Sequence, residues 1–301
     1  MIYIIITSYK EPNATKNAVE AFLKQKIAQE FKIVVVDPFL ETEQFLKANI
    51  NDKRIEFFLD PGEGKSYALN LILEMLYSEN KDDIFVFSDG DVYVSNNALE
   101  EITKAFGNLQ IGCVTGKPVS IDSRKTKYGY WSHFLFDGIH KVRKKLSAQK
   151  KFLECSGYLF AIRNGIISSF PIETSEDSII PYLLWKKAYK IYYADKAEVY
   201  VKNPSNWKDW TNQKIRNIKG HENLNKIAPD MPRTKSFFNE IKQGLLAWII
   251  YPKNIKEFFW TIELYFARLY LYLRAFKELK QQKFYQDGWR EVEMKSTRIG
   301  D

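Results

Sequence analysis

The first 110 residues alternate short apolar runs, rich in β-branched and aromatic side chains, with segments of helical periodicity. The apolar runs cover residues 3–6, 33–36, 55–59 and 84–87, and segments 13–28, 41–48 and 66–77 between them carry apolar residues at three- and four-residue intervals. This order predicts parallel strands joined by right-handed crossovers, with helices over both sheet faces. The predicted fold class is therefore α/β, a doubly wound and mostly parallel sheet.

Composition narrows the class of protein. The 301 residues are 45% hydrophobic and 15% aromatic, with 45 Lys plus Arg against 37 Asp plus Glu, which predicts a folded chain of net charge +8. Two cysteines, Cys113 and Cys155, are too few for a disulfide scaffold, and no secretory leader is recognisable. A cytosolic location is the expectation. The basic surplus favours an anionic partner, which leaves nucleic acid, anionic lipid and a phosphorylated substrate open.

Beyond residue 110 the pattern changes. Segment 138–153 holds six Lys or Arg and no acid and predicts an exposed basic helix, while 178–188 predicts another helix. Segment 202–235 is polar and basic and predicts a mobile loop region. The apolar stretch 243–252 is bounded by lysines and is too short for a membrane span.

Acidic side chains follow three of the four predicted strands of the first half, at the sheet edge where such folds bind ligands. Asp89 and Asp91 lie two residues apart, and two carboxylates so placed can hold a hard divalent cation completed by substrate phosphates. A strand-ending Asp-Gly turn explains the pair equally well. An EF-hand loop is excluded because Val94 occupies the place that needs glycine.

Three other motifs each have a functional and a structural interpretation. Residues 62–66 resemble the end of a phosphate-binding P-loop, but Leu59 stands where the first glycine of that motif is required, which argues against a P-loop. Two interpretations of the segment stay open: an anion-binding site at the start of a helix, or a turn followed by a capped helix. The acids of 175–177 suit either the first turn of a helix or a general base. Segment 213–216 suits an exposed helix. The three histidines form no zinc-ligand pair.

In their order along the chain, these motifs resemble the family-2 glycosyltransferases of the GT-A fold over roughly residues 1–220. The resemblance is closest to the branch that includes cellulose and hyaluronan synthases, whose pattern ends in Q-x-x-R-W. Asn217 stands here where that branch has Trp. The order of motifs is Thr7-Ser8-Tyr9-Lys10-Glu11, Asp37, Gly64-Lys65 with Ala68-Leu69-Asn70, Asp89-x-Asp91, Glu176-Asp177 and Gln213-x-x-Arg216.

The resemblance implies a division of roles. Residues 1–110 would be the nucleotide-sugar half, 111–235 the acceptor half with the catalytic carboxylate, and 236–301 a C-terminal aromatic helical region. Asp177 would be the base, and Asp89 and Asp91 would ligate Mg²⁺ or Mn²⁺, with Asp89 also near the ribose. The nucleotide-sugar residues implied are Thr7, Tyr9, Glu11, Asp37, Lys65 and Asp89, and those at the acceptor and pyrophosphate end are Gly157, Glu176, Gln213 and Arg216.

The expected activity is inverting, metal-dependent transfer of a sugar from a nucleotide diphosphate to a hydroxyl, on a glycan or a lipid-linked acceptor, as in polysaccharide biosynthesis. In this family Asp37 would face the base, which favours a UDP-sugar. A sugar nucleotidyltransferase is the alternative, yet no glycine follows the first predicted strand in 7–12. Nucleic acid is not an expected partner, because the basic run 138–153 has one aromatic residue, Phe152.

The C-terminal segment 237–276 is rich in aromatic and aliphatic residues around Pro252. Glu263, Arg268 and Arg274 interrupt it, so a helix with a single polar face is not expected. Two helices packed on the catalytic domain are predicted, with some aromatic surface touching the inner face of the cytoplasmic membrane. Burial against the protein or a dimer contact is the alternative.

Overall fold

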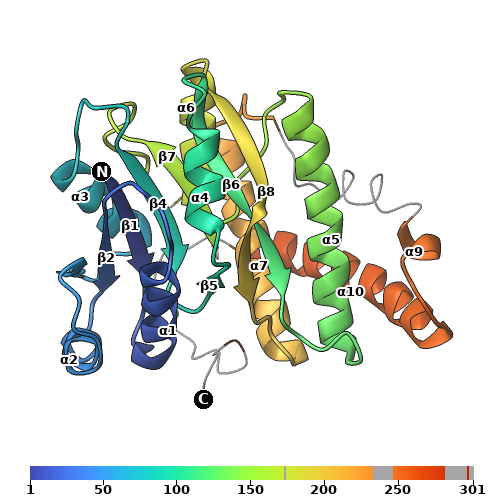
Figure 1. Ribbon diagram of the computed structural model, residues 1–301. Helices are drawn as coiled ribbons and strands as arrows, with labels where there is room; N and C mark the ends of the chain where they lie inside the picture. Colours follow the sequence, from blue (N-terminus) through green and yellow to red (C-terminus); the bar gives the residue numbers. More distant parts are fainter. Residues whose placement is uncertain (173, 233–246, 282–296, 298–301) are drawn as a thin grey trace.

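A mixed sheet flanked by helices on both faces forms the centre of the computed structural model, which describes residues 1–172, 174–232, 247–281 and 297 (Figure 1). The strand order is β3-β2-β1-β4-β7-β6-β8-β5. The first four strands are parallel, with Thr7 at the end of β1 level with Asp89 at the end of β4. These elements are β1 (Ile2–Thr7), β2 (Phe31–Asp37), β3 (Ile55–Leu59) and β4 (Ile84–Asp89), joined through α1 (Pro12–Leu23), α2 (Leu40–Asn49) and α3 (Lys65–Met75).

The second half of the sheet contains antiparallel strands. β7 pairs antiparallel with both β4 and β6, whereas β6 and β8 pair in parallel. The α/β, GT-A-like class predicted from the first 110 residues is confirmed, with the qualification that this half mixes strand directions. Its elements are β5 (Tyr93–Val94), α4 (Ala98–Ala105), β6 (Ile111–Ser120), α5 (Lys127–Ala148), β7 (Leu159–Arg163), α6 (Glu176–Lys186), β8 (Lys190–Val201) and α7 (Trp207–Ile227).

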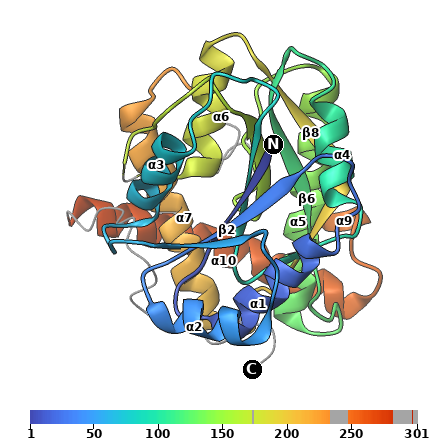
Figure 2. The ribbon, with the colours of Figure 1, turned by 60° about the vertical axis from the view of Figure 1, so that its left-hand side comes forward.

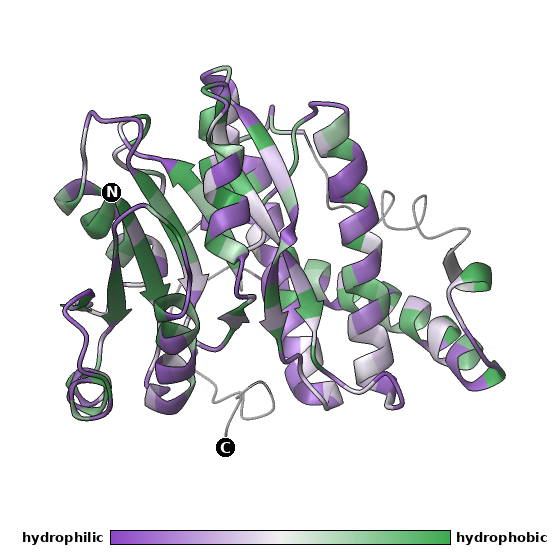
Figure 3. Ribbon diagram, viewed as in Figure 1, coloured by the Kyte–Doolittle hydropathy of each residue, from purple (hydrophilic) through white to green (hydrophobic). Residues whose placement is uncertain are grey.

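Alternating side chains of the strands fill two separate cores. Ile4 and Ile6 of β1 point into a core covered by α1, α2 and α4, and Ile5 points into the opposite core, covered by α3 and α6. Figure 2 shows these helices on the two sides of the sheet, and Figure 3 shows the strands of the first half coloured as hydrophobic. Burial on both faces explains why these strands read as continuous apolar runs.

Of the two sequence expectations about the basic segments, one is wrong and the other is correct in kind but not in its bounds. Residues 202–235 were expected to form a mobile loop region, but 207–227 form α7, whose Trp210, Ile215 and Leu224 are buried. The basic helix expected at 138–153 begins at Lys127, where Thr126 caps it. Most of the charged residues in both segments lie on the solvent side of an amphipathic helix, with Arg143 a buried exception, so the amino-acid composition did not reveal the apolar face.

Two further helices, α9 (Ala247–Ile250) and α10 (Ile255–Lys280), follow in the described part of the C-terminal segment, while 237–246 lies outside the described residues. α10 packs on α5 and α7 in a third core with Trp131 and Trp210. Arg124 anchors its start through an ion pair with Glu257 at 2.9 Å. The expectation of helices packed on the catalytic domain agrees with this arrangement. No helix among the described residues has the length and apolar character to cross a bilayer.

Candidate active site

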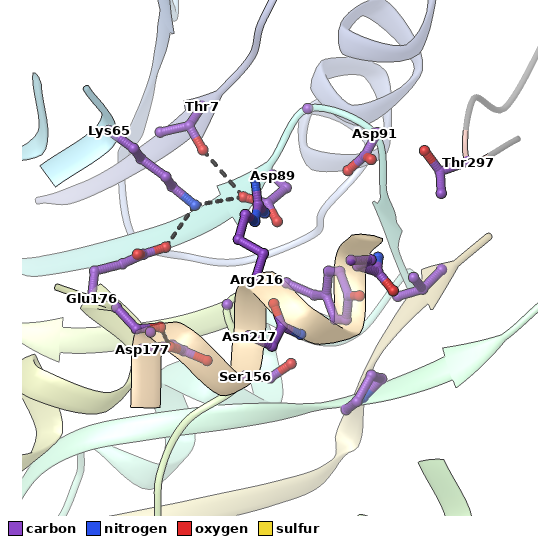
Figure 4. Close-up of a pocket in the computed structure, with 18 of the residues that line it drawn as sticks. Thr7, Lys65, Asp89, Asp91, Ser156, Glu176, Asp177, Arg216, Asn217 and Thr297 are labelled. Carbon is purple, nitrogen blue, oxygen red and sulfur yellow. Dashed lines mark hydrogen bonds and ion pairs between the residues drawn. The ribbon is translucent and has the colours of Figure 1, made fainter. Parts of the chain in front are cut away.

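A cavity of about 330 Å³ lies at the carboxyl ends of β1 and β4, where the sheet predicts a ligand site (Figure 4). Every site residue predicted from the sequence lines this cavity, with the exception of Asp37. The lining residues that were predicted are Thr7, Tyr9, Glu11, Lys65, Asp89, Asp91, Gly157, Glu176, Asp177, Gln213 and Arg216. These residues come from six different parts of the chain, and the fold brings them together in one cavity.

The pairing of β1 with β4 positions the two aspartates. Because Thr7 and Asp89 are level in the ladder, the Thr7 hydroxyl donates to Asp89 Oδ1 at 3.2 Å, and Gly90 N donates to Thr7 O at 2.7 Å. A Cβ on Gly90 would come within 3.0 Å of Ser8 Cβ and 3.1 Å of the Thr15 hydroxyl. These distances are tighter than ordinary contacts, so glycine lets the chain turn against β1 and present Asp91 to the cavity without displacing these neighbours.

Lys65 stands between the acids of the two halves. It begins α3 after Gly64, whose φ of 108° favours glycine. Its ammonium lies 2.7 Å from Asp89 Oδ1 and 2.6 Å from Glu176 Oε1 (Figure 4). Burial opposes the charged form of Lys65, but the two carboxylates outweigh burial and raise the pKa of Lys65 above its ordinary value. The lysine is thus a fixed counter-ion inside the cavity.

The helix α6 starts with the two acids that the sequence singled out. Burial raises the pKa of Glu176, and the nearby Asp177 adds to this increase, although Lys65 opposes it. Asp177 Oδ1 accepts a hydrogen bond from Ser175 Oγ, and the Asp177 carbonyl accepts one from Cys155 N at 2.9 Å. These bonds fix the orientation of the Asp177 carboxylate.

Glycine keeps the space in front of Asp177 open. A Cβ built on Gly157 would lie 3.7 Å from Asp177 Oδ2, an ordinary contact distance, so the missing side chain leaves room for a ligand atom against this oxygen. Gly157 and Asp177 both line the cavity. The arrangement can take a proton from a hydroxyl that enters this space.

Helix α7 closes the cavity with the polar residues expected there. Arg216 points toward Asp89 and Asn217 lies beside it (Figure 4). Gln213 also lines the cavity, and its Oε1 is buried with no hydrogen-bond partner in the described part of the chain. A buried amide oxygen of this kind indicates a missing donor, which a bound ligand can supply.

Asp37 is fully buried outside the lining of this cavity. Its carboxylate accepts hydrogen bonds from Phe39 N at 2.8 Å, from Lys10 N at 3.1 Å and from the Thr42 hydroxyl at 3.1 Å. Burial raises its pKa, while these hydrogen bonds oppose the increase. In this structure Asp37 organises the turns after β1 and β2, and its contact with a nucleotide base stays a prediction.

Several lining residues were not identified as site residues in the sequence. Arg143 belongs to the basic run that was expected to be solvent-exposed, and His221 was considered only as a zinc ligand. Thr297 lies near Asp91, far away in the sequence, and no motif marks it (Figure 4). Ser156 adjoins Gly157 and could have been found from that glycine.

The two aspartates are the residues suited to a metal. Across the described ranges, no group of three or more His, Cys, Asp or Glu side chains could hold a metal ion. Asp89 and Asp91 nevertheless offer hard carboxylate oxygens on one turn at the cavity wall. This donor set fits Mg²⁺ or Mn²⁺, cations that take their remaining ligands from phosphate oxygens and water.

The chain resembles known proteins both in its family and in its fold. A family model described as glycosyltransferase like family 2 matches residues 1–220. Among solved structures, the mannosyltransferase PcManGT from Pyrobaculum calidifontis, in complex with GDP-Man and Mn²⁺, superposes with a TM-score of 0.58 at 15% sequence identity, over 94% of this chain and 79% of that one. No curated protein sequence matches this chain.

Proposed function

This chain belongs to the glycosyltransferase-like family 2 and is a glycosyltransferase, and on that premise we propose that it transfers a sugar from a nucleotide diphosphate to a hydroxyl with inversion at the anomeric carbon. The observation that carries the proposal is the position of Asp177. Its carboxylate is fixed by neighbouring hydrogen bonds and faces open space beside Gly157, in the cavity that Asp89 and Asp91 also line.

The residues divide into two chemical roles in this proposal. Breaking the anomeric C–O bond leaves negative charge on the departing diphosphate, which Lys65 and Arg216, both in the cavity lining, would stabilise. Asp177 takes the proton of the acceptor hydroxyl as that oxygen attacks the opposite face of the anomeric carbon. A single carboxylate base requires direct displacement, and direct displacement inverts the configuration.

Asp89 and Asp91 would hold a divalent cation, Mg²⁺ or Mn²⁺, with the donor diphosphate. When bound, such a cation neutralises the phosphate oxygens of the leaving group. The Mn²⁺ named for the mannosyltransferase of similar fold supports this assignment. Lys65 already neutralises Asp89 in the structure described here, so its ammonium would shift toward the diphosphate as the donor enters.

The donor class proposed is a nucleoside diphosphate sugar. Asp37 was the reason to favour uridine, but its carboxylate already accepts three hydrogen bonds from the turns around it. The structurally similar mannosyltransferase was solved with GDP-Man, which supports testing guanosine donors beside uridine donors. For the domain division we keep 1–110 as the donor half, 111–235 as the acceptor half and 236–301 as the C-terminal region.

We further propose that α9 and α10 contact an anionic membrane surface. Phe259, Phe266 and Leu273 are 58%, 69% and 63% exposed and, at spacings of seven residues, lie on one side of α10, opposite the side that packs on α5 and α7. Further exposed apolar residues on these two helices are Ile249, Ile250, Ile255, Leu269, Tyr270 and Phe276, and the cations nearby are Lys253, Lys256, Lys277 and Lys280. An apolar stripe with cations beside it suits the headgroup region of anionic lipids.

A donor panel tests the proposed activity. Purified protein is incubated with UDP-, GDP- and TDP-sugars and Mn²⁺, and release of the nucleoside diphosphate is measured for the wild type, Asp91→Asn and Asp177→Asn. We expect release with one class of donor and its loss in Asp91→Asn. Transfer to an acceptor should fall by about 10²- to 10⁴-fold in Asp177→Asn while nucleotide binding is kept. Full transfer by Asp177→Asn, or a product with retained configuration, would refute the inverting mechanism.

A further inference from the structure

Arg143 is a buried cation in the wall of the cavity. It lies on α5, is 5% exposed, and lines the cavity together with Gly157 and Asp177. Its Nε donates to Glu154 O at 3.1 Å and its Nη2 donates to Cys155 O. Since a guanidinium carries five N–H donors, these two hydrogen bonds leave part of its donor capacity unused.

No acidic side chain neutralises Arg143 within the described residues. Glu154, whose carbonyl accepts from Arg143, also has a buried carboxylate, but this group accepts from Ser178 Oγ at 2.8 Å and lies 3.5 Å from His221 Nδ1, and no ion pair joins it to Arg143. Burying a cation without an anion costs several kcal/mol, because the lost hydration is not replaced. The site therefore has an electrostatic deficit that an anion would relieve.

Another buried arginine shows what a purely structural role looks like in this protein. Arg163 is 2% exposed and donates to four backbone carbonyls, those of Ile111, Lys81, Phe106 and Asn108, and Asp82 lies 3.9 Å away. Arg163 does not line the cavity. Arg143 has half as many carbonyl acceptors and faces the cavity, so packing alone does not account for it.

The position of Arg143 identifies which substrate would carry the anion. Cys155, whose carbonyl holds Arg143, donates its own N–H to the carbonyl of Asp177, and Gly157 follows two residues later. Arg143 is thus tied to the same loop that faces the proposed base. An anion at Arg143 would belong to the molecule whose hydroxyl meets Asp177, which is the acceptor.

The surroundings of Arg143 favour a phosphate ester. His221 from α7 also lines the cavity, with its Nδ1 3.5 Å from Glu154 Oε2, so the wall of the cavity carries nitrogen donors from both α5 and α7, which suits an anion with several acceptor oxygens. Phe136 and Ile139 line the cavity from the same face of α5 as Arg143, at spacings of seven and four residues. They provide an apolar wall next to the anion.

We propose that Arg143 forms an anion subsite, separate from the diphosphate site at Asp89 and Lys65, that binds a phosphate group of the acceptor. The inference rests on the proposed function, because it names the acceptor class for that site. The acceptor would carry a phosphate monoester or a diphosphate. The alcohol esterified to this phosphate could be a sugar or an isoprenoid, and the subsite would recognise the phosphate in both cases.

Calorimetry with two phosphate probes tests the subsite. The protein is first saturated with the nucleoside diphosphate and Mn²⁺, which occupies the donor site, and is then titrated with methyl phosphate and, separately, with farnesyl phosphate. Wild type should bind methyl phosphate, and Arg143→Met should bind it at least about tenfold more weakly, as expected for loss of a charged hydrogen-bonding partner. Arg143→Lys should be intermediate. The exposed Lys145→Met on the same helix is the matched control and should bind as wild type does.

The two probes distinguish the sources of phosphate. Tighter binding of farnesyl phosphate, lost in Phe136→Ser, would indicate a lipid-linked acceptor, and equal binding would indicate a water-soluble one. Equal binding of methyl phosphate by wild type and Arg143→Met, or no binding by wild type, would overturn the proposal. If the variants do not fold, an arsenate soak of wild-type crystals decides instead: an anomalous peak at Arg143 supports the subsite and its absence refutes it. The preceding nucleotide titration reports on the proposed function independently.

Discussion

Replacing Lys65 by Met tests whether this ammonium is the counter-ion that allows two carboxylates to share the cavity. Lys65 contacts Asp89 at 2.7 Å and Glu176 at 2.6 Å, and the side chains of the three residues are only 10–27% exposed. Removing one partner of a buried ion pair typically costs 3–5 kcal/mol. Because these side chains keep some solvent contact, we expect the free energy of unfolding to fall by about 3 kcal/mol at pH 8.

The loss should depend on pH in a defined direction. In wild type, Lys65 opposes the burial that raises the pKa of Glu176, so without Lys65 that pKa rises further. A carboxyl whose pKa is higher in the folded state than in the unfolded state destabilises the fold increasingly as pH rises above its unfolded pKa of about 4.3. The penalty in Lys65→Met should therefore shrink between pH 8 and pH 5, where Glu176 binds a proton. The charge of Lys65 itself is constant over this range, because its pKa is raised.

Urea unfolding at pH 5 and pH 8, followed by circular dichroism, measures the effect. Lys32→Met is the matched control, since Lys32 forms an ion pair with Glu56 at 2.6 Å on the open surface and its removal should change stability little at either pH. The reasoning fails if Lys65→Met is as stable as wild type at pH 8, or if its deficit is the same at both pH values.

Three other perturbations address the site and the C-terminal helix. Gly157→Ala should leave the melting temperature unchanged, because the added Cβ makes ordinary contacts, but should lower kcat/KM for the acceptor about 10- to 100-fold by filling the space before Asp177; unchanged acceptor kinetics would contradict this. Asp37→Asn should lower the free energy of unfolding by about 1–3 kcal/mol, since an amide cannot accept all three hydrogen bonds of the carboxylate. If Asp37 only organises the turns, the affinities for UDP and GDP will fall together, and a selective loss for UDP would show that it reads the base. Phe266→Ser with Leu273→Ser should weaken co-sedimentation with phosphatidylglycerol vesicles at least about tenfold, whereas Leu109→Ser, equally exposed elsewhere, should not; equal binding by both variants would exclude the α10 stripe as the contact.

The fold of the first half was predictable because local and global signals agree there. The central residues of β1 (4–6) and β2 (33–36) are all apolar, because both faces of these strands are buried, and the helices between the strands carry clear three- and four-residue spacing. In α7 and α5 the two signals conflicted. Basic and polar residues are frequent in both helices, yet Trp210 and Trp131 are buried at their inner faces against α10, a contact that only the tertiary structure supplies.

Site residues were predictable where they stand at strand ends or helix starts, because parallel topology brings these positions to one edge. Asp89, Asp91, Lys65 and Asp177 all meet this condition. Which partner each side chain takes was not predictable: the bridge from Lys65 to Glu176 joins residues 111 positions apart. Arg143 was not predicted as a site residue, because it belongs to a run of basic residues and such runs ordinarily lie on the solvated surface.

The distribution of charge in the cavity suggests where the excess of basic residues in the chain acts on a substrate. On the donor side, Lys65 is balanced by Asp89 and Glu176 before any ligand binds, so that region can accept a diphosphate only by rearranging existing ion pairs. On the proposed acceptor side, no acidic side chain among the described residues balances Arg143 in this way. A cation already paired adds less to affinity than an unpaired one, because the ligand must compete with the internal acid. Under the proposed division of the cavity, an anion therefore gains more from Arg143 than from Lys65, and Arg143 would favour an acceptor that carries a phosphate.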